Sequence, residues 1–314
     1  MPTLSNPEKL LLVAGSSNQP LAQKIADLIG APLGDTEVTI FPNKETRIRI
    51  NEDLSGKNVY IVQSFSDPPD RMLMEFLQFT DAAKRSGATK IIGVVPWLGY
   101  SAQDKVFRSG EPLSSELVSR MLGTAGLDEM ITLDLHSPLN LDHLKQAGIA
   151  VTHLSAIDIF VEVFKQSKDI ADWMVLCIDK GAEERSRKFS EELSLPLVTL
   201  RKNRDLADGT VTFEDFTVDL RGKNIISFDD FVSTGGSRIK ASSILKSVGV
   251  KKYVDCITHG LLGNDAADKI QASLIDEMYI TDSYPIPKEK QVPKIHILTS
   301  ATIFAEAIKK QTEN

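Results

Sequence analysis

An apolar run that ends in two acidic residues, followed by a turn of small residues, is the part of this chain best suited to chemistry. The sequence IISFDDFVSTGGSRIKASSILKSVG places Asp229 and Asp230 directly before the turn at 233–237. Gly235 and Gly236 allow a ligand to approach the backbone closely, and the first N–H groups of the helix that follows attract an anion. Two adjacent carboxylates accept hydrogen bonds from vicinal hydroxyl groups. The motif therefore predicts a site for a phosphorylated sugar, and an acidic turn before an ordinary helix cap is the alternative that it leaves open.

The elements that would position this motif alternate between short apolar runs and helical patterns. The runs that predict strands are LLLVA from Leu10, EVTIF from Glu37, NVYIVQ from Asn58, KIIGVVP from Lys90, EMITLD from Glu129, MVLCID from Met174, LVTL from Leu197, KNIISFDD from Lys223, KYVDCITHG from Lys252 and KIHIL from Lys294. The first five of these are expected to be buried. Helices are expected between them, for example over 182–193 and 236–248. This alternation predicts an α/β fold with mainly parallel sheets flanked by helices, and ligands then bind beyond the carboxyl ends of the strands.

The same rhythm divides the chain into two α/β domains of similar size. The N-terminal domain is expected at 1–148 and the C-terminal domain at 149–293, since the alternation restarts after about residue 150. The segment DSYPIPKEKQVP contains three prolines and is predicted to be a linker. The last segment, 294–314, is a strand and a helix, and its helix is expected to join the N-terminal domain.

Composition and charge exclude several classes of protein. Hydrophobic residues make up 42% and charged residues 25% of the 314 residues, which is typical of a globular protein and not of a disordered chain. The formal net charge of −7 offers no positive field for a nucleic-acid backbone, whereas a small phosphate needs only a few charges in one pocket. The longest uncharged apolar stretch, 91–102, is shorter than the roughly 20 residues of a membrane span. We therefore expect a cytoplasmic protein with neither nucleic-acid nor membrane partners.

Five motifs spread along the chain resemble those of the ribose-phosphate diphosphokinases, the enzymes that make phosphoribosyl diphosphate. The motifs are FPNKETRIRI, PWLGYSAQDKVFRSGEP, TLDLHS, CIDKGA and DDFVSTGGS. They stand in the family's order, and the resemblance covers nearly the whole length. It implies two tandem phosphoribosyltransferase-like units. It also implies transfer of the β,γ-diphosphoryl group of ATP to the C1 hydroxyl of ribose 5-phosphate, with release of AMP.

The resemblance further implies a role for individual residues of this chain. Ribose 5-phosphate would be bound by Asp229, Asp230, Ser233, Thr234, Gly235, Gly236 and Ser237. The nucleotide would be bound by Phe41, Asn43, Glu45, Gln103 and Asp104, with the first three reaching across from a neighbouring subunit. Lys202 and Arg204 would be the catalytic residues of a mobile loop, and His136 and Asp179 would help to place Mg²⁺.

Taken without the resemblance, several of these residues have simpler interpretations. His136 would be a hydrogen-bonded histidine at a strand end, and Lys202 and Arg204 would belong to a solvated turn. Phe41 would be a buried side chain beside a hairpin turn. One position also departs from the family, because Ala102 stands where the family carries an arginine that contacts ATP phosphates. The loss of that charge puts the nucleotide affinity in question.

Three alternatives to an active ribose 5-phosphate diphosphokinase remain open. A phosphoribosyltransferase would share the acidic pair and turn, although the first α/β unit is surplus to a single-domain transferase. A regulatory paralogue without activity is favoured by Ala102 and disfavoured by Lys202, Arg204 and His136. A diphosphokinase that uses a larger ribose-phosphate acceptor or another nucleotide donor fits every motif. The partners expected are ATP, ribose 5-phosphate and further copies of the chain, as at least a dimer and up to a hexamer.

Overall fold

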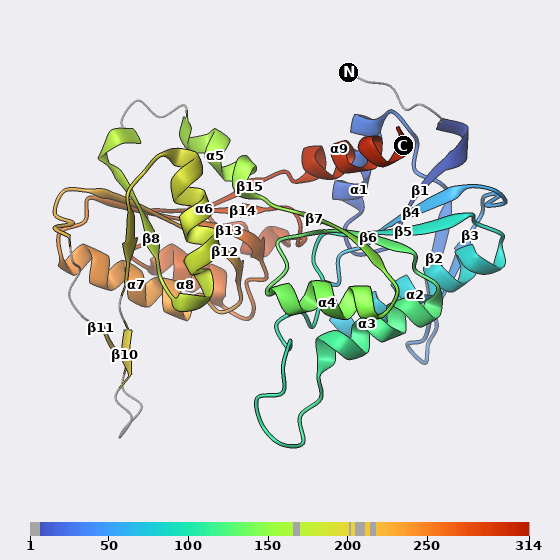
Figure 1. Cartoon of the computed structure of the whole chain (residues 1–314), viewed down its shortest axis with the longest axis horizontal. Helices are drawn as coiled ribbons and strands as arrows, with labels where there is room; N and C mark the ends of the chain where they lie inside the picture. The colour runs from blue at the N-terminus through green and yellow to red at the C-terminus, as the bar shows by residue number, and fades with distance from the viewer. Residues whose placement is uncertain (1–6, 166–169, 201, 205–210, 214–217, 314) are drawn as a thin grey trace. The chain divides into compact units, whose positions relative to one another are not determined.

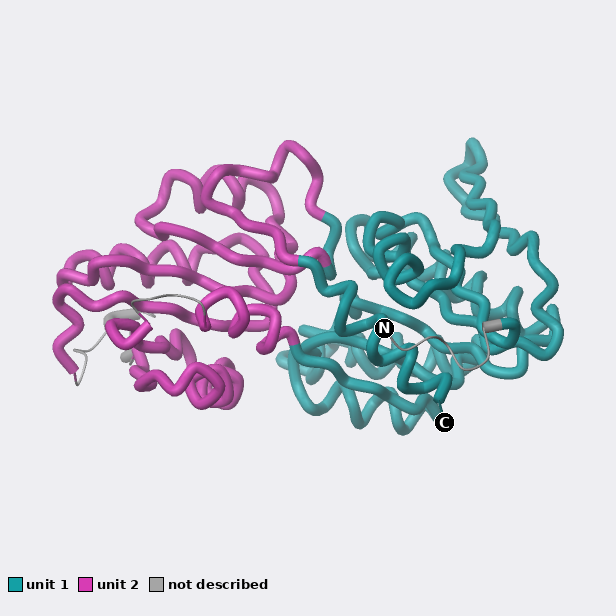
Figure 2. The backbone as a smooth tube through the Cα atoms, turned by 90° about the horizontal axis from the view of Figure 1, so that it is seen from above, with its two compact units in different colours: residues 1–155, 283–285, 299–314 teal, residues 156–282, 286–298 magenta. Residues whose placement is uncertain are grey.

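The computed structural model of the chain describes residues 7–165, 170–200, 202–204, 211–213 and 218–313 (Figure 1). The chain divides into two compact units, which Figure 2 distinguishes by colour. Unit 1 comprises Met1–Ser155, Ser283–Pro285 and Thr299–Asn314, and unit 2 comprises Ala156–Asp282 and Ile286–Leu298. Each unit is built around one parallel sheet, which confirms the prediction of an α/β fold with helices on mainly parallel sheets.

Unit 1 contains a five-stranded parallel sheet in the order β1-β4-β5-β6-β7. Its strands are β1 (Leu10–Ala14), β4 (Asn58–Val62), β5 (Lys90–Val95), β6 (Glu129–Leu133) and β7 (Ala150–Leu154). Its helices are α1 (Gln19–Ile29), α2 (Pro69–Arg85), α3 (Ser114–Ala125), α4 (Pro138–Gln146) and α9 (Ala301–Thr312), and a short 3-10 turn, η1 (Pro7–Lys9), precedes β1. Helices α1 and α9 pack together on one face, and α2, α3 and α4 cover the other (Figure 1). Because both faces are covered, β1, β4, β5 and β6 are almost wholly buried apolar runs.

The run EVTIF, expected as a buried strand, instead forms an antiparallel hairpin outside the parallel sheet. Its strands are β2 (Thr36–Ile40) and β3 (Thr46–Ile50). Val38 and Ile48 face each other and pack on the core of unit 1, whereas Arg47 and Arg49 are exposed. The expectation of burial was wrong because an antiparallel pair can keep one face in solvent. A run of five residues is too short for its hydrophobic pattern to distinguish a buried strand from a half-exposed one.

Unit 2 contains a six-stranded parallel sheet in the order β15-β14-β13-β12-β8-β9. Its strands are β8 (Trp173–Cys177), β9 (Leu197–Thr199), β12 (Asn224–Val232), β13 (Lys252–Gly260), β14 (Glu277–Thr281) and β15 (Ile295–Leu298). Its helices are α5 (Ile157–Lys165), α6 (Glu183–Leu193), α7 (Gly236–Ser247) and α8 (Ala266–Ala272), with 3-10 turns η2 (Ile170–Asp172), η3 (Lys180–Ala182) and η4 (Lys288–Lys290). Helices α5 and α6 lie on one face of the sheet, and α7 and α8 lie on the other (Figure 1).

Two further segments complete the architecture. A small antiparallel sheet pairs β10 (Lys202–Arg204) with β11 (Val211–Phe213). The C-terminal segment contributes to both units, because β15 pairs with β14 in unit 2 whereas α9 packs on α1 in unit 1.

Candidate active site

The predicted phosphate site forms where β12 ends and α7 begins. Gly235 has a φ of +73°, which only glycine adopts easily, and this conformation turns the chain from the strand into the helix. The helical ladder starts with the Ile239 N–H, which donates to the Gly235 carbonyl at 2.9 Å. The N–H groups of Gly236 and Ser237 therefore precede the ladder and lie in the first helical turn. Ser233 is exposed on the same turn, so small residues and backbone donors are presented together, as an anion site requires.

A second loop holds this turn in place from the neighbouring strand. The Gly263 N–H donates to the Ser233 carbonyl at 2.9 Å, and the Leu261 N–H donates to the Val232 carbonyl at 3.0 Å. Both donors follow β13, which lies beside β12 in the sheet. The turn is thus braced at the carboxyl edge of two central strands, where a βαβ unit presents its ligand site.

The acidic pair at the end of β12 is buried and bound by two arginines. Asp229 and Asp230 are 8% and 3% exposed. Arg185, in the first turn of α6, contacts both carboxylates, and its Nη1 lies 2.5 Å from Asp230 Oδ1. Arg238 donates from Nη2 to the other oxygen of Asp229. Burial alone would raise the pKa of Asp229, but the Arg238 and Arg185 charges outweigh it and hold that pKa below its usual value.

The predicted metal ligand Asp179 lies at the same edge of the sheet as the acidic pair. Leu176 on β8 pairs with Ser227 on β12, so Asp179 and Asp230 each follow this pair by three residues. The Asp179 carboxylate accepts a hydrogen bond from the Ala182 N–H at 3.1 Å and remains partly exposed. Its charge also helps to raise the pKa of Arg238, so Asp179 is close enough to influence one of the two arginines that bind the pair.

The other predicted metal ligand, His136, belongs to unit 1 and follows β6 as a half-buried side chain. The structure thus places the two predicted ligands in different units. In the described part of the chain, no group of three or more His, Cys, Asp or Glu side chains converges in a way that could hold a metal ion.

The predicted adenine-binding residues lie together at the tip of the β2–β3 hairpin. The turn is closed by hydrogen bonds from the Phe41 N–H to the Glu45 carbonyl at 2.9 Å and from the Glu45 N–H to Asn43 Oδ1 at 3.2 Å. Phe41 is 36% exposed, and the Arg47 guanidinium lies over its ring at 5.3 Å from the centroid. Phe41 is therefore not the buried hairpin residue of the simpler interpretation, and a ring that is about one third exposed to solvent can stack on a base.

The loop between β5 and α3 carries the other predicted nucleotide residues. Gln103 accepts a hydrogen bond from the Ser114 hydroxyl at 2.6 Å, and Asp104 is 6% exposed. Asn140, from the segment that follows His136, donates to the Ser101 carbonyl at 3.1 Å. The loop after β5 is therefore connected within unit 1 to α4, the helix that follows β6.

Lys202 and Arg204 lie in the short strand β10 of the small antiparallel sheet. Lys202 pairs with Phe213, and Arg204 pairs with Val211. The structure describes the backbone of these two residues, and the connection at 205–210 lies outside its described part.

Two family models match this chain in sequence. The N-terminal domain of ribose phosphate pyrophosphokinase matches residues 10–126, and the phosphoribosyl synthetase-associated domain matches residues 171–314. Ribose-phosphate pyrophosphokinases from Clostridium acetobutylicum and Bacillus caldolyticus are 33% and 36% identical, over 99% and 97% of this chain and 97% and 95% of theirs. The chain belongs to the ribose-phosphate pyrophosphokinase family. Pyrophosphokinase and diphosphokinase are two names for one transferase activity, so the resemblance seen in the sequence is confirmed.

A solved structure supports the same conclusion for the fold. The phosphoribosylpyrophosphate synthetase from Mycobacterium smegmatis superposes with a TM-score of 0.90 and 29% identity, over 98% of this chain and 99% of that one. The superposition covers nearly the whole length of both proteins, so both α/β units of this ribose-phosphate pyrophosphokinase family member belong to the shared architecture.

The sequence motifs did not identify the two arginines that bind the acidic pair. Arg185 follows the CIDKGA motif, and Arg238 stands next to the predicted phosphate-binding residue Ser237. A signal was nevertheless present for Arg238, because it precedes Ala241 and Leu245 by three and seven residues and therefore lies on the buried face of α7.

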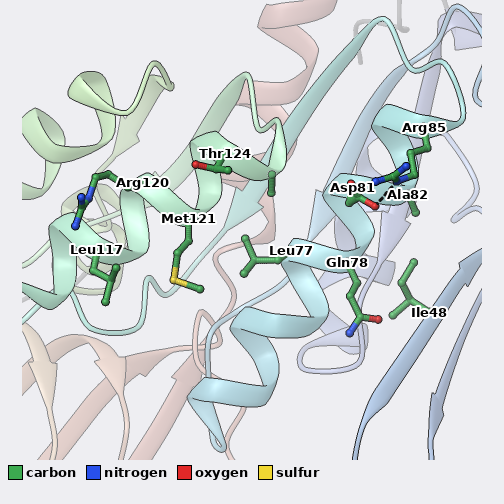
Figure 3. Close-up of a pocket in the computed structure, with 11 residues that line it drawn as sticks. Ile48, Leu77, Gln78, Asp81, Ala82, Arg85, Leu117, Arg120, Met121 and Thr124 are labelled. Atoms are coloured by element: carbon green, nitrogen blue, oxygen red, sulfur yellow. Dashed lines mark hydrogen bonds and ion pairs between the residues drawn. The ribbon is translucent and has the colours of Figure 1, made fainter.

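A hollow of about 890 Å³ in unit 1 lies away from these residues (Figure 3). It is lined from β3, α2 and α3, with Leu77 and Met121 pointing into it and an Asp81–Arg85 ion pair of 2.7 Å at its rim. None of the predicted site residues lines it.

No helix in the described ranges is long and apolar enough to span a membrane.

Proposed function

We propose that this chain transfers the diphosphoryl group of ATP to the C1 hydroxyl of ribose 5-phosphate, giving phosphoribosyl diphosphate and AMP. The observation that carries the proposal is the end of β12, where a buried acidic pair and a glycine turn before a helix stand side by side. This combination suits a ligand that has both a phosphate and vicinal hydroxyls. Membership of the ribose-phosphate pyrophosphokinase family supports the same reaction.

In this proposal the 5-phosphate binds at the turn 233–237, which offers the hydroxyls of Ser233, Thr234 and Ser237 and the first N–H groups of α7. The ribose hydroxyls bind at the acidic pair. Asp229 already accepts hydrogen bonds from Arg185, Arg238 and the Asp230 N–H, which leaves about one of its roughly four acceptor positions for the sugar. The arginines therefore fix the orientation of the pair before the sugar arrives.

The transfer itself needs charge neutralisation more than covalent help from the protein. The C1 oxygen attacks the β-phosphorus, the bond from that phosphorus to the α,β-bridging oxygen breaks, and AMP leaves with the bridging oxygen. The hydroxyl proton is released. We assign Lys202 and Arg204 to the migrating diphosphoryl group, where their positive charges act mainly in the transition state.

Magnesium is the metal that this chemistry implies, and Asp179 suits it. Mg²⁺ commonly takes one or two protein carboxylates and completes its shell with water and phosphate oxygens. The partly exposed Asp179 oxygens, beside the acidic pair, fit that donor set, and His136 is a weaker ligand because Mg²⁺ prefers oxygen. When bound, Mg²⁺ neutralises charge on the phosphates of the nucleotide.

We assign the adenine to Phe41, Asn43 and Glu45, and the nucleotide phosphates to the loop with Gln103 and Asp104. The hairpin tip and the Phe41 ring are exposed, which supports a stacking role across a contact with a second copy of the chain. The enzyme would then be active only as an oligomer of at least two chains. A cytoplasmic location agrees with this use of ATP.

Phosphorus NMR on the purified protein with ribose 5-phosphate, ATP and Mg²⁺ tests the proposal, since AMP and a C1-linked diphosphate should appear together. Lys202→Ala should lower the turnover on the order of a hundredfold while ribose 5-phosphate still binds. Lys251→Ala, an exposed lysine beyond α7, is the matched control and should leave both unchanged. Failure to form either product with any nucleoside triphosphate would contradict the proposal and favour the regulatory alternative that Ala102 suggests.

A further inference from the structure

Arg238 is an unusual residue for the start of a phosphate-binding helix, because its long charged side chain is almost completely buried. It is the third residue of α7 and is only 5% exposed. Arginine is rarely buried to this extent unless it is paired. Its side chain reaches below the turn to two carboxylates on the neighbouring strands, Asp229 on β12 and Asp255 on β13.

The geometry of the sheet explains why one arginine can reach both carboxylates. Ser227 pairs with Asp255 in the β12–β13 register, and Asp229 lies two residues beyond Ser227. Because side chains alternate along a strand, Ser227, Asp229 and Asp255 lie on one face of the sheet. Helix α7 covers that face, so the guanidinium fork lies between the helix and the sheet, over the two strands, with Nη2 on Asp229 and Nη1 at 3.4 Å from Asp255 Oδ1.

Asp255 has the character of a buried counter-charge. It is 0% exposed, and its Oδ1 also accepts a hydrogen bond from the Ser227 hydroxyl at 2.5 Å. Its Oδ2 has no hydrogen-bond partner in the described part of the chain. Burial, only partly offset by Arg238, raises the pKa of Asp255 to about 6.

The charges of this cluster do not balance when every group is ionised. Two arginines, Arg185 and Arg238, face three carboxylates, Asp229, Asp230 and Asp255. Asp229 contacts both arginines and its pKa falls, whereas Asp255 has only the longer contact to Arg238 and its pKa rises. Arg238 is thus shared between the two carboxylates, because the Asp255 and Asp229 charges both raise its pKa, and Asp255 holds the guanidinium from the side away from the turn.

We propose that Arg238 is a positioning residue for ribose 5-phosphate, which joins the two halves of its site. Its backbone N–H lies in the first turn of α7, where the phosphate is expected, and its side chain fixes the Asp229 carboxylate, where the sugar hydroxyls are expected. One residue therefore sets the distance and angle between the groups that bind the phosphate and the carboxylate that binds the sugar hydroxyls. Asp255 supports this by anchoring the second arm of the fork. The inference rests on the proposed function of the turn and the acidic pair.

A purely structural role predicts a different behaviour, because a buried ion pair often stabilises a fold little and can be removed as a pair. Arg238→Met alone leaves Asp255 buried without its counter-charge and should lower both the melting temperature and the affinity. Arg238→Met with Asp255→Asn removes both charges and should recover most of the melting temperature. It should not recover the affinity, because Asp229 still lacks its second arginine.

The test measures ribose 5-phosphate binding by calorimetry together with thermal unfolding. We expect the double variant to bind about tenfold or more weakly than the parent, with an unchanged KM for ATP and a similar kcat at saturating substrates. Arg221→Met, in an exposed pair with Asp219, is the control and should leave affinity unchanged. Parent-like affinity of the double variant would overturn the positioning role while leaving the proposed function intact.

A second variant covers the case in which the double variant does not fold. Arg238→Lys keeps one positive charge but cannot bridge Asp229 and Asp255 as a fork, so it should fold and bind ribose 5-phosphate several-fold more weakly. Unchanged affinity in Arg238→Lys would also overturn the inference. Absence of ribose 5-phosphate binding by the parent protein would instead refute the proposed site itself.

Discussion

The two glycines of the phosphate turn differ in what an added methyl group would meet, and this difference yields a sharp prediction. Gly235 has a φ of +73°, and a Cβ built on it would lie 3.3 Å from Ile270 Cγ1. Gly236 lacks a positive φ, and the nearest atom to its Cβ would be Thr234 Oγ1 at 3.9 Å. Alanine is therefore strained at the first position and unstrained at the second in the ligand-free protein.

The size of each effect follows from these geometries. An L-residue in the left-handed region costs about 1–2 kcal/mol, so Gly235→Ala should lower the free energy of unfolding by about that amount. Gly236→Ala should leave it unchanged or raise it by up to about 1 kcal/mol, because alanine restricts the unfolded chain. In the proposed site, however, the new methyl group at Gly236 would stand where the 5-phosphate is expected to approach the backbone. Loss of one charge-assisted hydrogen bond, worth about 1.5–3 kcal/mol, corresponds to a loss of affinity of at least tenfold.

Urea unfolding and calorimetry with ribose 5-phosphate measure the two quantities separately. Gly222→Ala is the matched control, since Gly222 has a φ of +72° with no atom within 4 Å of its Cβ and lies in a turn before β12. It should lose stability as Gly235→Ala does and keep the parent's affinity. Parent-like binding by Gly236→Ala would refute the phosphate site, and an equal loss of stability at Gly235 and Gly236 would refute the backbone reasoning.

Three further predictions concern the charge cluster and the nucleotide site. Burial raises the pKa of Asp255 to about 6, above its value in the unfolded chain, so the folded protein binds more protons between about pH 4 and 6. The contribution of Asp255 to the free energy of unfolding should therefore fall by about 3 kcal/mol as pH rises through this window, and urea titrations of Asp255→Asn should lack this component. Ala102→Arg should lower the KM for ATP in steady-state assays, and an unchanged KM would mean that another cation already meets the phosphates. Phe41→Ala should raise the KM for ATP without changing ribose 5-phosphate affinity in calorimetry; equal losses for both ligands would contradict base stacking.

The fold was predictable wherever apolar runs are continuous and their length is typical of strands. The central strands β4, β5, β12 and β13 are of this kind over most of their length, because helices on both faces favour apolar side chains at most positions. The edge strand β7 was missed, since Thr152 and His153 interrupt its apolar pattern and its side chains are only partly buried. The β2–β3 hairpin was misplaced because a five-residue run does not distinguish a central strand from one side of a hairpin.

The phosphate turn was predictable for a different reason. Its members, 229–237, are contiguous in the sequence, so a local pattern contains the whole site. Asp179 was found through the resemblance, and its place beside the acidic pair depends on the β8–β12 register, which no local pattern contains. The arginines that bind the pair come from α6 and α7 and are brought to it only by tertiary packing.

The sequence nevertheless contained a signal for the buried charges that the motifs overlooked. Asp255 stands inside KYVDCITHG, a buried central strand, next to the apolar residues Val254 and Cys256, and Arg238 stands on the apolar face of the helix that precedes this strand. In a right-handed βαβ unit that face must lie on β12 and β13. Neither charge could be buried there alone, because an unpaired buried ion is too costly. The two opposite charges can be buried together because they pair. The presence of Asp255 in the strand therefore predicts Arg238 as its partner, and the presence of Arg238 predicts Asp255. This part of the sheet is polar because Asp229 needs a counter-charge that is fixed in place.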